Sequence, residues 1–498
     1  MALQVDQLRW MAERYGDETA YAQLASKDLL TFARWDQSSN RLARGLSGAG
    51  IEAGDRVVLH LENEHLDRWL ISYAAIHKAG AVAVPTNTRL TAAELRAILG
   101  DAGPAALITS TRLRPTLEDA LAGGPRPRLV LDADDHDSWC PTLVEDASPF
   151  QVPVGDDDLA DILYTSGTTG LPKGVAVRHR NTHQIPNGEP EWTGNSWIHC
   201  SPLSTFAGIS FVYNPMKMGM RGLYLPRFDP DPWLDAVEQW RPTMAFLVPA
   251  MVQLLLTHPR FATADLSSLT LLSIGSAPLP PVLHRQIAER LPDAMVTNNY
   301  SMTEAGSAFT YLPPGEITRR PGSVGMPLPP TRIRIADDDD QAVPTGETGH
   351  VLIGVGDQHR EYYGDPKATE QTWSGEWLRS GDLGFLDDDG YLYIVGRAKD
   401  VIIRGGNNIA ATEVESALYE HDGVLEAAVV GIPHEVLGED VAAYVVPRPG
   451  VSLDADELRD FCAARLADYK VPRQVWFVDE LPRNATGKVL KRELVPPT

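Results

Sequence analysis

The chain has 498 residues, with 44 lysines and arginines against 67 acidic residues, and its formal net charge is −23. Such an acidic surface repels nucleic acids and anionic membranes, so neither is expected as a partner. No apolar run has the length of an integral membrane segment, and the first residues lack the pattern of a signal segment. The 3 cysteines are widely spaced and show no disulfide or zinc pattern, so we expect a cytoplasmic protein. Acidic clusters at 156–158, 337–340 and 387–389 stand beside turn signals and are expected to be solvated loops, with a weak metal site as the alternative.

Predicted strands over 56–61 and 81–85 alternate with predicted helices over 66–80 and 90–99. This alternation is typical of a mostly parallel sheet covered by helices, so the sequence predicts an α/β fold. Farther along, an apolar helix is predicted over 245–256.

The stretch 164–175 reads YTSGTTGLPKGV and lies between two predicted strands. Glycines let backbone N–H groups approach an oxyanion, hydroxyls donate hydrogen bonds to phosphate oxygens, and a lysine adds positive charge. The run differs from a Walker loop because Pro172 stands directly before Lys173. Since strands flank it, a hairpin with a phosphate-binding loop fits better than a flexible linker. The predicted phosphate-binding residues are Thr165, Ser166, Gly167, Thr168, Thr169, Gly170 and Lys173.

This loop resembles the phosphate loop of the adenylate-forming superfamily, which holds acyl- and aryl-CoA synthetases, adenylation domains of peptide synthetases and beetle luciferases. Further motifs follow in the family's order, and the resemblance covers nearly the whole chain. It implies a large N-terminal domain of mixed β-sheets packed with helices over residues 1–398. It also implies a small mobile α+β C-terminal domain over residues 399–498, with a hinge at Lys399.

The stretch 298–305, NNYSMTEA, resembles the family's second nucleotide motif. The resemblance implies that Tyr300 stacks on adenine and Thr303 contacts phosphate. It also implies that Glu304 and Thr168 hold Mg²⁺, which prefers carboxylate and phosphate oxygens. The remaining residues implied for ATP or AMP are Ser276, Ala277 and Pro278 of LLSIGSAP, with Asn298, Asn299 and Ser301.

Three motifs towards the C-terminal end complete the resemblance. Asp382 in SGDL matches the carboxylate that binds both ribose hydroxyls, and Arg397 in GRAKD matches the arginine that contacts ribose and phosphate. Lys488, in LPRNATGKVLKREL, matches the family's catalytic lysine. A glycine turn is implied to lie along the path of coenzyme A, with the predicted contacts Gly405, Gly406 and Asn408.

The stretch 198–211 reads IHCSPLSTFAGISF. In the family an aromatic residue and a histidine follow the Pro-Leu pair; here Ser204 and Thr205 replace them, which removes bulk near the acyl tunnel. A plain turn from strand to helix is the alternative for these two residues. The predicted acyl-pocket residues are Ser204, Thr205, Phe206 and Gly208, together with Asn299 and Ser301, which replace family glycines.

Methionines follow that stretch at positions 216, 218 and 220, and they either line an apolar acid pocket or pack in the core. We therefore expect a bulky, mainly hydrophobic acid, such as a fatty, polycyclic or natural-product acid.

The resemblance implies an AMP-forming acyl-CoA synthetase, an acid–thiol ligase that uses ATP, Mg²⁺ and coenzyme A. A carboxylate would attack the α-phosphorus of ATP to give acyl-AMP and pyrophosphate, and the acyl group would then pass to coenzyme A. Lys488 would serve the first step, and rotation at the hinge would bring the Gly406 turn into use for the second. The predicted catalytic residues are Lys488, Glu304, Thr303 and Lys173.

Three other classes of protein compete with this interpretation. An adenylation enzyme would share every motif but load the phosphopantetheine arm of a carrier protein. Nothing in the chain favours a luciferase-like monooxygenase, and the complete set of catalytic residues disfavours a nucleotide-binding regulator. The expected partners are a small carboxylic acid and coenzyme A or a carrier protein, and the chain is expected to be a monomer or homodimer.

Overall fold

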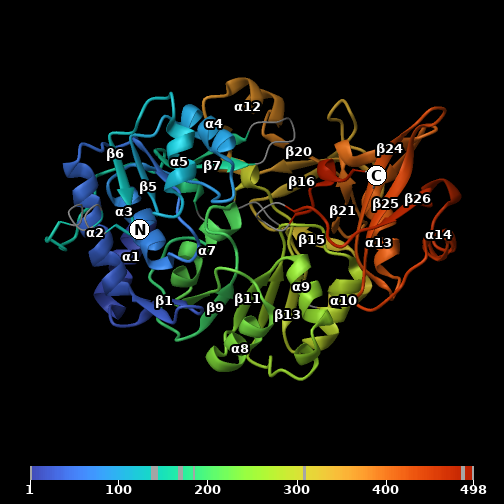
Figure 1. Ribbon diagram of the computed structural model, residues 1–498, viewed down its shortest axis with the longest axis horizontal. Helices are drawn as coiled ribbons and strands as arrows, with labels where there is room; N and C mark the ends of the chain where they lie inside the picture. The colour runs from blue at the N-terminus through green and yellow to red at the C-terminus, as the bar shows by residue number, and fades with distance from the viewer. Residues whose placement is uncertain are drawn as a thin grey trace. The chain divides into compact units, whose positions relative to one another are not determined.

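The computed structural model describes residues 3–135, 139, 144–165, 172–182, 185–306, 310–313, 315–483 and 488–495, apart from the side chain of residue 357. The chain forms two compact units, each built from three stretches of sequence. The first unit consists of Met1–Phe246, Met302–Ala308 and Gly356–Gln371. The second consists of Leu247–Ser301, Phe309–Val355 and Thr372–Thr498. Figure 1 colours the chain by residue number, from blue at the N-terminus to red at the C-terminus.

A seven-stranded sheet in the first unit has the order β18-β8-β7-β4-β3-β5-β6. Its strands are β3 (Arg56–Leu59), β4 (Val82–Pro85), β5 (Ala106–Thr109), β6 (Leu129–Asp132), β7 (Leu159–Thr165), β8 (Lys173–Arg178) and β18 (Glu361–Tyr362). Strands β3 to β7 pair in parallel, whereas β8 is antiparallel to β7 and to β18. The predicted strands near 56 and 81 are confirmed.

Helices cover both faces of this sheet, and they are α1 (Gln4–Tyr15), α2 (Phe32–Gly48), α3 (Leu66–Lys78), α4 (Ala92–Ala102) and α5 (Arg114–Leu121). Successive residues of a strand point to opposite faces. Val57 and Leu59 therefore pack in the core formed with α1, α2 and α3, while Val58 packs against α4 and α5. The alternation of strand and helix that predicted an α/β fold is thus confirmed.

Five further strands, which belong to the first unit apart from Leu247 at the end of β11, pair side by side in the order β2-β1-β10-β9-β11. They are β1 (Thr19–Gln23), β2 (Asp28–Thr31), β9 (Ser196–His199), β10 (Arg221–Tyr224) and β11 (Met244–Leu247). Helices α7 (Phe206–Lys217) and α8 (Pro230–Trp240) connect β9 to β10 and β10 to β11. Trp35 of α2 stacks on Tyr213 of α7 with ring centroids 5.4 Å apart, so α7 is anchored in the core of this unit.

The second unit begins with α9 (Pro249–Thr257), the 3₁₀ turn η2 (Pro259–Ala262), β12 (Leu271–Ile274), α10 (Pro281–Arg290) and β13 (Met295–Asn298). The predicted helix over 245–256 is wrong at its start, because strand β11 extends to Leu247 and the helix begins at Pro249. Proline suits the first position of a helix, where its missing N–H would have had no partner.

An antiparallel sheet follows, in the order β14-β15-β21-β20-β17-β16, with β19 paired to β20. Its strands are β14 (Thr310–Tyr311), β15 (Ser323–Pro327), β16 (Arg332–Ala336), β17 (Gly349–Gly354), β19 (Trp373–Ser374), β20 (Trp377–Leu386) and β21 (Leu392–Arg397). The short helix α11 (Glu316–Arg319) precedes β15. Helix α12 (Pro366–Thr372), which belongs to the first unit apart from Thr372, precedes β19 in the sequence.

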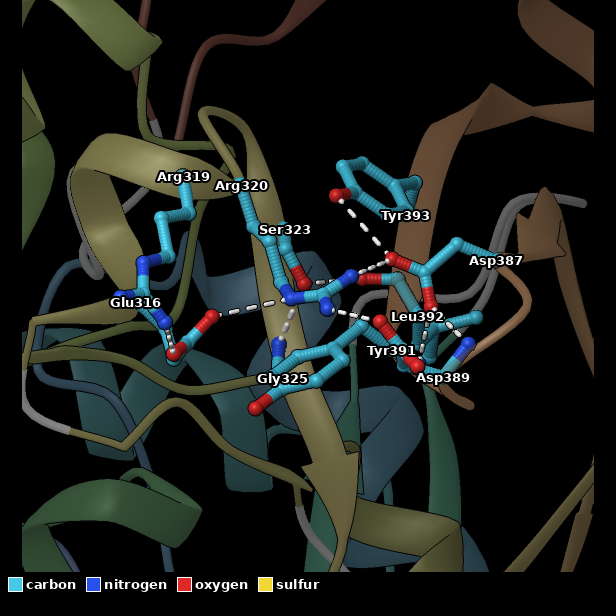
Figure 2. A network of polar contacts seen from close by, with 10 residues as sticks. All are labelled: Glu316, Arg319, Arg320, Ser323, Gly325, Asp387, Asp389, Tyr391, Leu392 and Tyr393. Carbon is cyan, nitrogen blue, oxygen red and sulfur yellow. Dashed lines mark hydrogen bonds and ion pairs between the residues drawn. The ribbon is translucent and has the colours of Figure 1, made fainter.

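Figure 2 shows how Arg320 ties α11 to the turn between β20 and β21. Its guanidinium donates to Glu316 at 3.0 Å, forms ion pairs with Asp387 and Asp389, and lies 4.0 Å from the ring centroid of Tyr391. The side chain of Asp387 is only 21% exposed, so the expectation of a solvated loop is wrong for this residue. The network fixes the two strands that carry Asp382 and Arg397.

The C-terminal part of the second unit has a core of its own, formed by residues such as Ile402, Val414, Val429 and Leu458. Its elements are β22 (Val401–Arg404), β23 (Asn407–Ala410), α13 (Ala411–Tyr419), β24 (Val424–His434), β25 (Gly438–Pro447), α14 (Ala455–Ala463) and β26 (Gln474–Phe477). The expected α+β character is confirmed, while the predicted boundary between residues 398 and 399 stays a prediction. Among the residues that the structure describes, no helix is long and apolar enough to span a membrane.

Candidate active site

The predicted phosphate loop lies between strands β7 and β8, which pair in the register Thr165 with Lys173 and Tyr164 with Gly174. The two flanking strands of the predicted hairpin are confirmed. Five of the predicted phosphate-binding residues lie outside the described residues: Ser166, Gly167, Thr168, Thr169 and Gly170. At the end of the hairpin, the Lys173 ammonium lies 5.2 Å from the ring centroid of Tyr362. Strand β18 carries that tyrosine alongside β8, with Tyr362 opposite Val175.

Thr303 and Glu304 form a 3₁₀ turn, η3 (Thr303–Ala305), in the first unit. The Tyr362 hydroxyl donates to Glu304 Oε1 at 3.0 Å, so one tyrosine contacts both Lys173 and Glu304. The Thr303 carbonyl accepts a hydrogen bond of 2.7 Å from Arg360. The structure thus brings together three of the predicted catalytic residues that are distant in sequence: Lys173, Thr303 and Glu304.

The chemistry of this turn fits Mg²⁺ bound together with a nucleotide. Among the described residues there is no group of three acidic, His or Cys side chains that could enclose a metal ion. Mg²⁺ is usually held by one or two carboxylates plus substrate phosphates, and Glu304 next to Thr303 offers such a carboxylate.

Thr205 is the N-cap of helix α7, because its hydroxyl accepts from the Gly208 N–H at 3.1 Å and donates to the Pro202 carbonyl at 2.7 Å. Gly208 is required there: an added Cβ would lie 2.0 Å from the Pro202 oxygen. The cap gives Thr205 a local structural role where the family carries a histidine, which matches the turn considered from sequence. The neighbouring residues Ser204 and Phe206 are half-buried.

The methionines beyond this helix start do not form one apolar surface. Met216 packs in the core of the first unit, Met220 is buried, and Met218 is 36% exposed. Core packing, the alternative left open from sequence, therefore describes Met216.

In the second unit, the turn of Ser276, Ala277 and Pro278 directly follows strand β12. Ser276 has φ of +69°, a conformation rare for residues other than glycine. Asn299 donates to Ser273 Oγ of β12 at 2.6 Å. The Asn299 amide is thus held beside β12, the strand that this turn follows, and its place in the acyl pocket stays a prediction.

Asn298, at the end of β13, donates to the Ser323 carbonyl at 3.3 Å, while Ser301 is exposed. Asn298 therefore fixes the end of β13 to β15, close to the start of the predicted adenine-stacking segment.

Tyr300, Asp382 and Arg397 form a polar group in the second unit. The Tyr300 hydroxyl donates to Asp382 Oδ2 at 2.6 Å, and Arg397 Nε lies 2.9 Å from Asp382 Oδ1. Asp382 and Arg397 face each other across β20 and β21, and Arg397 also donates to the Ser380 carbonyl at 3.0 Å. Burial raises the pKa of the Asp382 carboxyl, opposed by Arg397, by the Tyr300 hydroxyl and by Lys488.

The charge of Lys488 acts on the same group, because it opposes the rise in the pKa of Asp382. The pKa of its ammonium is lowered, first by desolvation and then by Arg397, while Asp382 and Asp400 oppose the shift. The lysine predicted to be catalytic and the carboxylate predicted to bind ribose therefore influence each other's charge, although 106 positions separate them.

Gly405 and Gly406 form the two-residue turn of the hairpin between β22 and β23, in which Arg404 faces Asn407 and Ile403 faces Asn408. Their φ angles are +56° and +82°. Two positive values in succession are what a type I′ hairpin turn requires, which explains the two glycines. An added Cβ on Gly406 would meet no atom within 4 Å, so this side of the turn is open. Lys399, the predicted hinge, lies in the 3₁₀ turn η5 (Ala398–Asp400) just before β22.

Both parts of the chain match models of one enzyme family. Residues 8–363 match the family model described as AMP-binding enzyme. Residues 413–488 match the one described as AMP-binding enzyme C-terminal domain. The chain belongs to the AMP-binding enzyme family. The resemblance to the adenylate-forming superfamily is thereby confirmed, and this AMP-binding enzyme is an acid–thiol ligase.

Three similar proteins show the extent of the likeness. A feruloyl-CoA synthase of Amycolatopsis sp. is 38% identical over 473 residues, which is 93% of each chain. A fatty acid–[acyl-carrier-protein] ligase of Streptomyces coeruleorubidus is 34% identical over 493 residues, covering 96% of this chain and 93% of that one. The crystal structure of the anthranilate CoA ligase AuaEII with anthranoyl-AMP is similar with a TM-score of 0.88 and 27% identity, over 98% of this chain and 95% of that one.

Two residues near the predicted site of this AMP-binding enzyme were missed from sequence: Arg360 and Tyr362. They lie in a short segment that reads HREYYGDP. The signal available there was the pair Tyr362-Tyr363 before a Gly-Asp-Pro turn, because an aromatic pair beside a turn signal is compatible with a short strand.

Proposed function

We propose that this enzyme joins a carboxylic acid to coenzyme A through an acyl adenylate. In the first step a carboxylate oxygen bonds to the α-phosphorus of ATP, and the bond from that phosphorus to the pyrophosphate oxygen breaks. In the second step the thiol of coenzyme A gives its proton to solvent, its sulfur bonds to the acyl carbon, and the bond from that carbon to the AMP oxygen breaks. The observation that carries the proposal is the group of Tyr300, Asp382 and Arg397, to whose charge Lys488 contributes.

We assign the nucleoside to this group in the second unit. The Asp382 carboxylate can accept hydrogen bonds from both ribose hydroxyls, and its ion pair with Arg397 opposes the rise in its pKa that burial causes. Tyr300 would pack on the adenine through its ring while its hydroxyl holds Asp382 in place. Lys488 would stabilise the negative charge on the attacking carboxylate and on the bridging oxygen, which is where charge concentrates during adenylation.

We assign the phosphates to residues of the first unit. Thr165 and Lys173 stand at the two ends of the predicted phosphate loop, and Lys173 supplies positive charge. Glu304, next to Thr303, would hold Mg²⁺, which neutralises phosphate charge when it is bound. The hydrogen bond from Tyr362 orients the Glu304 carboxylate before any ligand arrives.

For the acid, we propose a bulky and mainly hydrophobic monocarboxylic acid. Thr205 takes the place of a larger family histidine and is held as a helix cap, which leaves less bulk at this position. The two relatives named above are named for ferulate and for fatty acids, both larger than acetate. Steady-state assays with ferulate, anthranilate, fatty acids, acetate and malonate test the assignment. Pyrophosphate release that is highest with acetate or malonate would contradict it.

A carrier protein as acceptor is the second candidate, because one relative is named as a fatty acid–[acyl-carrier-protein] ligase. Supplying coenzyme A and a phosphopantetheinylated carrier protein in parallel, with mass detection of both thioesters, separates the two acceptors. We also propose a cytoplasmic location, which is supported by the free thiols of Cys200 and Cys462.

A further inference from the structure

Arg360 is a buried arginine in the first unit, only 3% exposed, and the reaction described above does not use it. It immediately precedes strand β18, which pairs with β8 at the end of the phosphate hairpin. Burying a guanidinium is costly unless its donors and its charge are matched. The contacts that match Arg360 therefore indicate what it does.

Two of the contacts of Arg360 are backbone carbonyl groups. It donates to the Thr303 carbonyl at 2.7 Å and to the Asn181 carbonyl, and the Asn181 side chain in turn donates to the carbonyl of His359 at 3.2 Å. Gly306, at the end of the Thr303–Glu304 turn, has φ of +65°, and an added Cβ there would lie 3.1 Å from the guanidinium. The turn is thus folded closely around Arg360.

A third contact reaches the start of helix α7. The guanidinium carbon lies 5.1 Å from the ring centroid of Phe206, within the range of a cation–π interaction. Phe206 directly follows the capping residue Thr205 and is one of the predicted acyl-pocket residues. One side chain therefore contacts both the turn predicted to bind Mg²⁺ and phosphate and the helix start predicted to contact the acid.

The charge of Arg360 is balanced by groups on two sides. Burial lowers its pKa to about 10, and Asp161, Glu304 and Tyr73 oppose that shift, so the side chain is charged at neutral pH. Asp161 lies in β7, is 1% exposed, and contacts His77 Nε2 at 3.2 Å. Arg360 thus interacts with a buried carboxylate in the strand leading into the phosphate loop and with the carboxylate of Glu304.

We propose that Arg360 is a positioning residue that fixes the Thr303–Glu304 turn relative to Phe206, so that binding of MgATP and activation of the acid both depend on it. This inference rests on the proposed function for the roles of Glu304 and Phe206. Arg360 touches neither reacting atom in this account. The competing explanation is that Arg360 only neutralises Asp161 in the core of the first unit, in which case its loss would lower stability and all activities together.

The test uses Arg360→Met, which keeps the length of the side chain but removes charge and donors, and Arg360→Lys, which keeps the charge but not the forked geometry. Arg178→Met is the matched control, because Arg178 lies at the end of the neighbouring strand β8 and pairs with Glu361 at 3.5 Å. Three quantities are measured for each variant: the Kd of MgATP by calorimetry, the rate of pyrophosphate release, and the rate of thioester formation from supplied acyl adenylate.

For Arg360→Met we expect MgATP to bind about 10-fold more weakly and pyrophosphate release to fall about 100-fold, the scale of one lost preorganised donor. Thioester formation from supplied acyl adenylate should stay within about 3-fold of wild type, because the Mg²⁺ and the pyrophosphate group that Glu304 is proposed to serve take no part in it. Arg360→Lys should show smaller losses of MgATP binding and of pyrophosphate release than Arg360→Met. Arg178→Met should keep the wild-type values of both.

Parallel loss of both half-reactions, or unchanged MgATP binding in Arg360→Met, would overturn the proposal. If that variant does not fold, Arg360→Lys and Phe206→Leu decide in its place: selective loss of pyrophosphate release supports the proposal, and no selective loss overturns it. A wild-type enzyme that releases no pyrophosphate with any acid would refute the proposed function instead. The binding measurement would still test Arg360 in that case.

Discussion

The hydroxyl of Tyr300 donates a 2.6 Å hydrogen bond to the carboxylate of Asp382, across 82 positions of sequence. The other oxygen of that carboxylate pairs with Arg397 at 2.9 Å. Both oxygens of Asp382 are therefore fixed in direction by neighbours. A carboxylate held in this way is prepared to accept two hydroxyls of one sugar, since each oxygen can accept more than one hydrogen bond.

Tyr300→Phe removes the hydroxyl and keeps the ring, so it separates orientation of Asp382 from stacking on adenine. A hydrogen bond to a charged group contributes about 1.5–3 kcal/mol, so we expect the KM for ATP to rise about 10-fold or more. The kcat should change little. Tyr311→Phe is the control, because Tyr311 lies in the same unit and its hydroxyl donates to Met295 Sδ at 2.9 Å. An unchanged KM for ATP in Tyr300→Phe would mean that Asp382 needs no help from this hydroxyl.

Thr205→Ala should destabilise the first unit, because it removes the cap of helix α7. The expected loss is about 1 kcal/mol in the free energy of unfolding. Thr205→Ser keeps a capping hydroxyl, so its free energy of unfolding should stay close to that of wild type. Chemical denaturation followed by the fluorescence of the buried tryptophans measures this difference. Equal stability of Thr205→Ala and wild type would show that the cap contributes nothing.

Thr205→His tests the same position for selectivity. The larger side chain should penalise the bulkiest acids most in kcat/KM, because it restores the bulk that the family histidine provides. Equal loss with every acid would place the residue in catalysis and not in selection.

The lowered pKa of Lys488 predicts the alkaline limit of the first half-reaction. Its ammonium is charged below the lowered pKa and neutral above it, and only the charged form can stabilise the attacking carboxylate. Pyrophosphate release should therefore fall as the pH rises through a value below the 10.5 of an ordinary lysine. Lys488→Arg keeps its charge, so the activity it retains should persist to higher pH. The same alkaline limit in both proteins would assign the limit to another group.

Gly406→Trp should spare pyrophosphate release and block transfer of the acyl group to coenzyme A. The turn is open on this side, so a large side chain would project from it into the predicted path of the thiol. Any substituent at φ of +82° adds backbone strain, so Gly406→Ala is the control that carries the strain without the bulk. Equal thioester rates in the tryptophan and alanine variants would mean that Gly406 only shapes the turn and does not lie along the path of the thiol.

The parts of this molecule with strong local patterns could be predicted from sequence. The strands around the phosphate loop follow from apolar runs on either side of a glycine-rich turn, and Gly405-Gly406 marks a hairpin because both residues need positive φ. The helix proposed over 245–256 failed at its start because a short apolar run does not distinguish strand from helix. Pro249 was the usable signal there, as a residue that begins helices.

The contacts made by Arg360 and Tyr362 could not have been predicted in the same way. They depend on β18, a strand of two residues, and so short a strand leaves no periodicity to detect. A buried charged residue is also invisible in a single sequence, because arginine is exposed in most of its occurrences. Only the folded chain shows that Arg360 lies on the ring of Phe206.

The most direct measurement of the central claim is the rate of each half-reaction in Lys488→Ala. The account predicts that pyrophosphate release falls by about 10²–10³, the effect of removing one preorganised charge, because Lys488 acts on the carboxylate that attacks ATP. Thioester formation from supplied acyl adenylate should proceed at nearly the wild-type rate. A fall of both half-reactions by the same factor would contradict the account.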